Sequence, residues 1–258
     1  LMRSSAASDV YKRQDQLGAF SSIVLDLFHG FLKVIACSAD RIVVCHVETS
    51  TMILSQSPIP IKGLRMHKDT VVISIGGSIL IPDKDDAAYI GKLAEMLKRA
   101  SESVRIAVVC GGGKIARYYA NTGRALGGSE DKLDMMGIDA TRINARLLAL
   151  ALGDSSTMDV RPTVKETAEM SEKVGIAVMG GTEPGHTTDA VATMLAEEMG
   201  ATRVVNATSV DAVYSEDPRK NPDAERYENL TIEQLGHIVY TDHGAGKSSV
   251  FDPLGVQI

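Results

Sequence analysis

The stretch MGGTEPGHTTDA, residues 179–190, joins a predicted buried strand to a predicted helix. The apolar run 174–178 is typical of a strand, and the pattern over 190–199 predicts a helix that ends at Gly200. Gly180, Gly181 and Gly185 therefore lie in a loop at the carboxyl end of a strand, where open α/β sheets bind ligands. Bare backbone N–H groups, threonine hydroxyls and the Asp189 carboxylate suit a polar or anionic ligand. Taken alone, these glycines would also suit a plain turn.

Two more loops of this kind lie upstream, and each follows a short apolar run. Gly76-Gly77-Ser78 follows 71–75, and Gly111-Gly112-Gly113-Lys114 follows 104–110. Helical patterns come next, over 87–100 and 115–126. This repeated order of strand, glycine loop and helix predicts an α/β fold with a mostly parallel sheet and helices on both faces.

The alternation continues to the end of the chain. Further helices are predicted at 132–152, 164–172 and 230–238, strands at 157–160 and 202–206, and loops at 207–218 and 242–249.

Residues 1–65 do not share this pattern. Runs 33–37 and 41–47 could form strands, but neither leads into a ligand-binding loop, and Pro58 and Pro60 mark a linker. Met66 comes just before the first strong strand. We hypothesise that Met66 is the natural start and that residues 1–65 are not native sequence. A genuine small N-terminal extension is the alternative.

Composition narrows the class of protein. The chain has 258 residues, 44% hydrophobic and 23% charged, as expected for one or two globular domains. A net charge of −6 argues against nucleic-acid binding. Three cysteines without metal-like spacing indicate a reducing compartment and no disulfide framework. No stretch reads as a membrane span or a signal peptide, so a cytoplasmic protein is expected.

Three glycine loops at strand ends imply that more than one anionic group is bound. None of them matches G-x-x-x-x-G-K-[ST] or G-x-G-x-x-G with a later acid, which disfavours a P-loop or a Rossmann dinucleotide site. Two phosphate-bearing ligands that meet at one sheet edge would suit phosphoryl transfer.

Five motifs in order identify a family resemblance from about residue 71 to residue 258. GGS, GGGKIAR, DMMGIDATRINA, GGTEPGHTTDA and TSVDAVYSEDP resemble the amino-acid-kinase family, and most closely its archaeal-type uridylate (UMP) kinases. The resemblance implies a three-layer α/β sandwich over 66–258, with an acceptor-binding half at about 66–185 and an ATP-binding half at about 186–258.

That family implies a reaction as well as a fold. The expected activity is transfer of the γ-phosphoryl group of ATP to UMP, giving UDP for pyrimidine nucleotide biosynthesis. The implied cofactor is Mg²⁺, bound as Mg-ATP. The implied partner is the chain itself, in a homohexamer.

The resemblance also assigns site residues. The expected ATP-binding residues are Gly77, Ser78, Gly113, Arg117, Thr208, Ser209, Tyr214 and Asp217. The expected UMP-binding residues are Gly112, Asp134, Thr182, Glu183, Pro184, Gly185, His186, Thr187 and Thr188, with Asp134 on the ribose hydroxyls. The expected catalytic residues are Arg117 and Asp189, the latter orienting cationic groups or Mg²⁺ near the transferred phosphoryl group.

Four of these assignments have a plainer structural alternative. Arg117 could be a solvated helix arginine, Asp134 a helix N-terminal acid, and Tyr214 a core tyrosine. Asp189 could cap the helix that follows it.

Three departures from the family pattern are visible. Ser74 stands where the wider family has lysine. The archaeal-type kinases lack that lysine too, so Lys114 and Lys247 are the candidates for the catalytic cation. Thr208-Ser209 replaces the usual Thr-Asn. The family continues beyond Ile258, so the polypeptide as given is expected to be poorly stable and nearly inactive.

Two other functions stay open. A kinase of the same fold could act on another acceptor, such as isopentenyl phosphate or N-acetylglutamate. The first would normally carry a histidine near the second glycine loop, where this chain has KIAR. A nucleotide-binding module without turnover is the second alternative.

Overall fold

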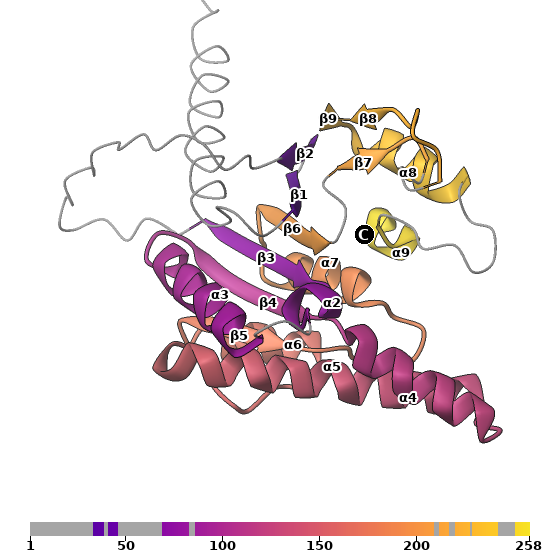
Figure 1. Ribbon diagram of the computed structural model, residues 1–258. Helices are drawn as coiled ribbons and strands as arrows, with labels where there is room; N and C mark the ends of the chain where they lie inside the picture. The colour runs from indigo at the N-terminus through magenta and orange to yellow at the C-terminus, as the bar shows by residue number, and fades with distance from the viewer. Residues whose placement is uncertain are drawn as a thin grey trace, which may run out of the picture.

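The computed structural model describes residues 33–38, 41–45, 69–82, 86–208, 212–216, 220–227, 229–241 and 251–258. Its centre is a seven-stranded sheet in the order β5-β4-β3-β6-β1-β2-β9 (Figure 1). The strands are β1 Lys33–Ser38, β2 Arg41–Cys45, β3 Thr70–Ile75, β4 Arg105–Cys110, β5 Ile176–Met179, β6 Arg203–Thr208 and β9 Asn229–Leu230. The four strands β5, β4, β3 and β6 are parallel to one another, whereas β1, β2 and β9 extend the sheet antiparallel beyond β6.

The parallel strands are apolar because both of their faces are covered. In β3, Val71, Ile73 and Ile75 pack into one buried cluster with helices α3 (Asp86–Ser101) and α5 (Glu130–Leu152). Val72 packs into the opposite cluster with α7 (Thr188–Glu198). Helices on both faces of the sheet confirm the predicted three-layer arrangement.

The same alternation determines where the polar residue of β3 lies. Ser74 is fully buried and shares the α7 face with Val72, since side chains two apart point to one face of a strand. Its register partner in β6 is Asn206, which is also buried. Two polar side chains therefore stand next to each other in an otherwise apolar layer.

Shorter elements complete the described chain. They are α2 Gly77–Leu80, α4 Gly113–Ala125, η1 Gly153–Ser155, α6 Val164–Met170, α8 Ile232–Thr241, α9 Pro253–Gln257 and a small sheet of β7 Val213–Tyr214 with β8 Arg226–Tyr227. A third, smaller core joins β7, β9 and α8 through Val213, Leu230 and Leu235. None of the helices in the described ranges is long and apolar enough to cross a membrane.

The structure differs from the sequence prediction in three places. Residues 157–160 are irregular, with a bend at Met158, rather than a strand, and the exposed Asp159 forms an ion pair with Arg161. The first two glycine loops are shorter than predicted, because α2 and α4 begin at Gly77 and Gly113. A linker was expected to separate the stretch that contains β1 and β2 from the rest of the fold, yet β1 pairs with the whole length of β6.

Some expectations lie outside the described residues. They concern Met66, the Pro58–Pro60 linker and the loop predicted at 242–249.

Candidate functional site

The first two glycine loops pack backbone against backbone at the carboxyl edge of the sheet. Strands β3 and β4 pair in parallel from Thr70↔Arg105 to Ile75↔Cys110, so both chains leave the sheet side by side. A Cβ atom on Gly77 would lie only 2.2 Å from the backbone N of Gly113. Gly113 itself has φ +61°, a conformation that glycine adopts at little cost. Only glycine allows this approach, which brings the N-terminus of α4 up to the first loop.

The N-terminus of α4 offers donors for an anion. Its N-cap residue is Gly112, which provides no side-chain cap for the first N–H groups of the helix. The helix dipole adds partial positive charge at the same place. Phosphate is a natural ligand for such a terminus.

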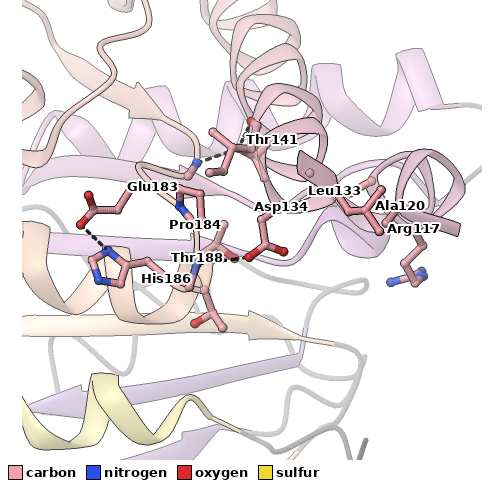
Figure 2. Close-up of a pocket in the computed structure, with 15 residues that line it drawn as sticks. Arg117, Ala120, Leu133, Asp134, Thr141, Glu183, Pro184, His186 and Thr188 are labelled. Carbon is pink, nitrogen blue, oxygen red and sulfur yellow. Dashed lines mark hydrogen bonds and ion pairs between the residues drawn. The ribbon is translucent and has the colours of Figure 1, made fainter. Parts of the chain in front are cut away.

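The third loop joins β5 to α7 and lies against α5. Gly181 N donates to Thr141 Oγ1 at 2.7 Å, and Gly185 N donates to Asp134 Oδ2 at 3.3 Å (Figure 2). Gly185 has φ +87°, so the turn at this position favours glycine. The cap of α7 is Thr187, whose Oγ1 accepts from Ala190 N at 3.2 Å. Asp189 is therefore not the helix cap, and that alternative is wrong.

A pocket of about 450 Å³ lies between this loop and helices α4 and α5 (Figure 2). Its volume falls in the range of small-molecule sites. Apolar side chains of α4 and α5 form part of the wall, and the polar groups come mainly from the loop and from Asp134 and Arg117. The lining residues are Ala116, Arg117, Ala120, Leu133, Asp134, Gly137, Ile138, Thr141, Gly181, Glu183, Pro184, Gly185, His186, Thr187 and Thr188.

Arg117 connects this pocket with the first glycine loop. It projects from α4, lines the pocket, and donates from Nη2 to Ser78 Oγ at 3.1 Å. The guanidinium is a planar fork of donors that suits phosphate oxygens. The family resemblance implies that Arg117 faces ATP, whereas in the structure Arg117 lies between the first glycine loop and the acceptor loop.

Glu183 and His186 form the outer rim of the pocket. His186 Nδ1 lies 3.4 Å from Glu183 Oε1 (Figure 2). The same nitrogen is 3.5 Å from Thr182 Oγ1. The Thr182 side chain thus meets the rim, although Thr182 does not line the pocket itself.

Asp189 is held from the sheet side by two buried donors. Ser74 Oγ donates to Oδ1 at 2.8 Å, and Asn206 Nδ2 donates to Oδ2 at 3.3 Å. Burial raises the pKa of Asp189, the Ser74 hydrogen bond lowers it, the charge of Asp252 raises it, and the Asn206 hydrogen bond lowers it. Asp252 in turn caps α9 by accepting from Leu254 N at 2.8 Å and Gly255 N at 3.3 Å.

The structure brings some predicted residues together and leaves others apart. Eight residues predicted for catalysis or UMP binding surround the pocket, namely Arg117, Asp134, Glu183, Pro184, Gly185, His186, Thr187 and Thr188. Gly77, Ser78, Gly112 and Gly113 adjoin one another at the two upstream loops. Thr208 ends β6, and Tyr214 lies in β7, half-buried against the third core. Ser209, Asp217 and the candidate cation Lys247 lie outside the described residues.

Four contacting residues were not found from the sequence. Asn206 holds Asp189, and three residues of α5 hold the glycine loops. Arg142 donates from Nε to Gly181 O at 3.2 Å and from Nη2 to Thr182 O at 3.1 Å. Asn144 Nδ2 donates to Gly111 O at 2.8 Å and Gly112 O at 3.3 Å, and Thr141 accepts from Gly181. Polar residues on the buried face of an otherwise amphipathic helix were the available signal.

Only the Nδ2 group of the Asn144 side-chain amide forms hydrogen bonds in the described part of the chain. Its side chain is almost completely buried, and Oδ1 has no hydrogen-bond partner among the described residues. Leaving such an atom unpaired costs about 1–3 kcal/mol. An apolar side chain would fill this space without that cost. We infer that Asn144 contributes through the hydrogen bonds that its Nδ2 donates to Gly111 O and Gly112 O.

A resident metal centre has no support in the described ranges. They contain no group of three or more His, Cys, Asp or Glu side chains that could hold an ion. A metal ion that took part in phosphoryl transfer at this edge would therefore need the phosphates of a bound nucleotide among its ligands.

Comparison with known proteins gives a consistent result. The amino acid kinase family model matches residues 69–257, which leaves the N-terminal stretch outside it. A uridylate kinase from Pyrococcus abyssi is 44% identical over 189 residues, covering 73% of this chain and 84% of that protein. A uridylate kinase from Methanococcoides burtonii is 43% identical over 189 residues, covering 73% and 80%.

A solved structure supports the fold. The crystal structure of uridylate kinase from Archaeoglobus fulgidus superposes with a TM-score of 0.64 at 40% identity, over 72% of this chain and 84% of that one. The predicted fold class is thereby confirmed.

Proposed function

The chain belongs to the amino acid kinase family, and from this premise we propose that it is a uridylate kinase that transfers the γ-phosphoryl group of Mg-ATP to UMP. The observation that carries the proposal is the pocket. In a chain about 44% identical to a uridylate kinase, seven of the nine residues expected to hold UMP, all but Gly112 and Thr182, line one cavity beside two glycine loops. We assign UDP as the product and pyrimidine nucleotide synthesis as the setting.

The acceptor nucleotide is proposed to lie along the pocket. Its phosphate would take the N-terminus of α4 at Gly112, with Arg117 alongside, because bare N–H groups and a guanidinium both favour phosphate oxygens. The ribose hydroxyls would donate to Asp134. Uracil would meet the loop residues Thr182, Glu183, Pro184, Gly185, His186, Thr187 and Thr188.

ATP is proposed to approach from the β3 and β6 side. Its phosphates would meet Gly77, Ser78 and Gly113, and its nucleoside would meet Thr208, Ser209, Tyr214 and Asp217. This arrangement keeps the proposed division into an acceptor half, about 66–185, and an ATP half, about 186–258. Magnesium would enter with ATP, and its charge would neutralise the phosphates that Gly77, Ser78, Gly113 and Arg117 bring together.

The reaction needs positioning more than acid–base chemistry. An oxygen of the UMP phosphate, already anionic, attacks the γ-phosphorus, a new P–O bond forms, and ADP leaves with the electrons of the broken bond. Arg117 bridges the pocket and Ser78, so it is proposed to stabilise charge on the transferred group. Asp189 is proposed to orient cationic groups behind the loops, with Lys114 and Lys247 as candidates because Ser74 replaces the usual lysine.

Self-association is proposed on a separate observation. Helix α5 exposes Ile143, Leu147 and Leu150, spaced four and three residues apart and so on one face. Leu126 of the α4–α5 region is 84% exposed. Apolar side chains in such a stripe favour a protein partner, and a second copy of this chain in a homohexamer is what the family resemblance implies. A cytoplasmic location follows from the same resemblance.

An acceptor panel tests the function. The protein would be assayed with Mg-ATP and UMP, CMP, AMP, isopentenyl phosphate or N-acetylglutamate, with ADP release as the readout. UMP should be preferred. Equal turnover of CMP, or turnover of another acceptor in place of UMP, would refute the assignment. Nucleotide binding without turnover would favour the sensing module.

A further inference from the structure

We propose that Thr141, Arg142 and Asn144 of helix α5 are positioning residues that align the two ends of the acceptor site. They connect the phosphate loop, residues 111–113, with the acceptor loop, residues 180–188. This role rests on the proposed function, because it concerns the site that would hold UMP. None of the three was expected from the motifs to bind a substrate.

The acceptor loop is held at its start by three backbone groups. Thr141 Oγ1 accepts from Gly181 N at 2.7 Å, and Arg142 donates to Gly181 O at 3.2 Å and to Thr182 O at 3.1 Å. With both sides of Gly181 paired, the peptide planes at the start of the loop are fixed. A Cβ on Gly180 would lie 2.5 Å from Thr141 Oγ1, so the loop lies directly on the helix.

Arg142 suits this task better than a lysine would. Its planar fork can donate to two carbonyls at once and keeps one geometry while it does so. A third donation, to Pro162 O at 3.5 Å, fixes the guanidinium from the side of the chain before α6.

The phosphate loop is held by Asn144 through two carbonyls. Its Nδ2 donates to Gly111 O at 2.8 Å and to Gly112 O at 3.3 Å. In a trans peptide the N–H points opposite to the C=O of the same unit. Turning these two carbonyls toward α5 therefore turns the N–H groups of Gly112 and Gly113 away from it. Asn144 thus orients the N–H groups of Gly112 and Gly113, which are the donors of the proposed phosphate site.

One helical turn performs both tasks. Residues 141, 142 and 144 span about 4.5 Å at 1.5 Å per residue, in a helix of 23 residues. Asp134, on the same helix, adds a contact to Gly185 N. A rigid helix thereby sets the distance between the phosphate end and the nucleoside end of the pocket. Phosphoryl transfer is sensitive to misplacement on the order of 1 Å, so such a support affects substrate use.

Kinetics of three variants test the assignment. Arg142→Met should raise KM for UMP about ten-fold and leave KM for ATP within about two-fold, because the loss is confined to the acceptor loop. Arg142→Lys should restore part of the loss. Arg146→Met is the matched control, since Arg146 is exposed on the same helix and has no assigned role. An equal rise in both KM values for Arg142→Met would overturn the proposal.

Hydrogen exchange gives a readout that does not depend on turnover. Thr141→Val keeps the shape of the side chain but removes the acceptor for Gly181 N, so amides of residues 180–188 should exchange at least ten-fold faster, while those of α3 stay unchanged. Asn144→Ser should do the same for residues 111–113. Unchanged exchange in both loops would overturn the proposal, whichever acceptor the protein uses. If wild-type protein does not phosphorylate UMP but these shifts occur, only the proposed function fails.

Discussion

At the level of single residues, Asp189 has conflicting surroundings. Burial and the charge of Asp252 raise its pKa, while hydrogen bonds from Ser74 and Asn206 lower it, and the net result is a raised pKa. A proposed organiser of the reaction would have to be ionised to attract cations. The hydrogen bonds from Ser74 and Asn206 then favour the ionised carboxylate in a site whose burial disfavours charge.

We expect the acidic limb of kcat to report this balance. As pH falls through the raised pKa of Asp189, the carboxylate is protonated and kcat should decline at a higher pH than for an ordinary aspartate. Ser74→Ala removes the hydrogen bond that lowers this pKa, so the limb should move to still higher pH. Ser103→Ala, on an exposed serine, is the control. A pH profile of kcat that is the same for all three proteins would contradict a role for ionised Asp189.

The raised pKa of Asp189 affects folding stability and kcat with opposite dependence on pH. The pKa of Asp189 in the folded protein lies above that in the unfolded chain. Its contribution to stability is therefore fully present below the unfolded pKa and is lost as pH rises through the folded pKa. Asp189→Asn should then be inactive but no less stable than the wild type at neutral pH, as measured by urea unfolding. A variant both inactive and strongly destabilised would indicate a structural role instead.

Asp134 is predicted to act on one substrate only. Asp134→Ala removes a charged acceptor proposed for the ribose hydroxyls and also frees Gly185 N, a loss of roughly 1.5–3 kcal/mol or about 10- to 150-fold in KM for UMP. KM for ATP should stay within about two-fold. Asp131→Ala, in the first turn of the same helix, is the matched control. A change confined to ATP would mean that the two nucleotide sites are reversed.

At the level of elements, backbone contact between α2 and α4 holds the glycine loops together. Gly77→Ala places a Cβ 2.2 Å from Gly113 N, and backbone on both sides leaves little room to relax. We expect a loss of about 1–3 kcal/mol and a fall in Tm of several degrees. Gly91→Ala in α3 is the control, because nothing lies within 4 Å and alanine favours the helix, so Tm should rise slightly. Equal Tm changes in the two variants would rule out the close contact.

Elements with strong periodicity were predictable, whereas the contacts between them were not. The long helix α5 and the buried runs of β3 and β4 were placed correctly because one face or both faces had to be apolar. The run at 157–160 resembled a strand but pairs with no strand in the described part of the chain. Ser74 meets Asn206 only through the register of β3 with β6, about 130 residues later, which no local pattern encodes.

At the level of the whole molecule, the sheet is larger than the family match. The family model begins at residue 69, yet β1 pairs antiparallel with β6 from Lys33↔Thr208 to Ser38↔Arg203, and β2 continues to β9. Antiparallel strands on the edge of a parallel sheet protect N–H and C=O groups that would otherwise be open to pairing with other chains. Strand β1 thus covers the edge of β6, whatever the origin of residues 1–65.

Deleting residues 1–65 should accordingly weaken the protein without unfolding it. All buried residues of the two main clusters lie between Val71 and Ala207, so the core that covers both faces of the parallel strands is kept. The loss is the pairing of β6 with β1 and of β9 with β2, whose backbone groups can bond to water instead, at a net cost of about 1 kcal/mol for each hydrogen bond. We expect a cooperative transition with Tm lowered by several degrees, and more self-association through the open β6 edge, measured by calorimetry and light scattering at several concentrations. Loss of the cooperative transition would show that residues 1–65 are part of the folding unit, and an unchanged Tm without association would show that β1 does not protect β6.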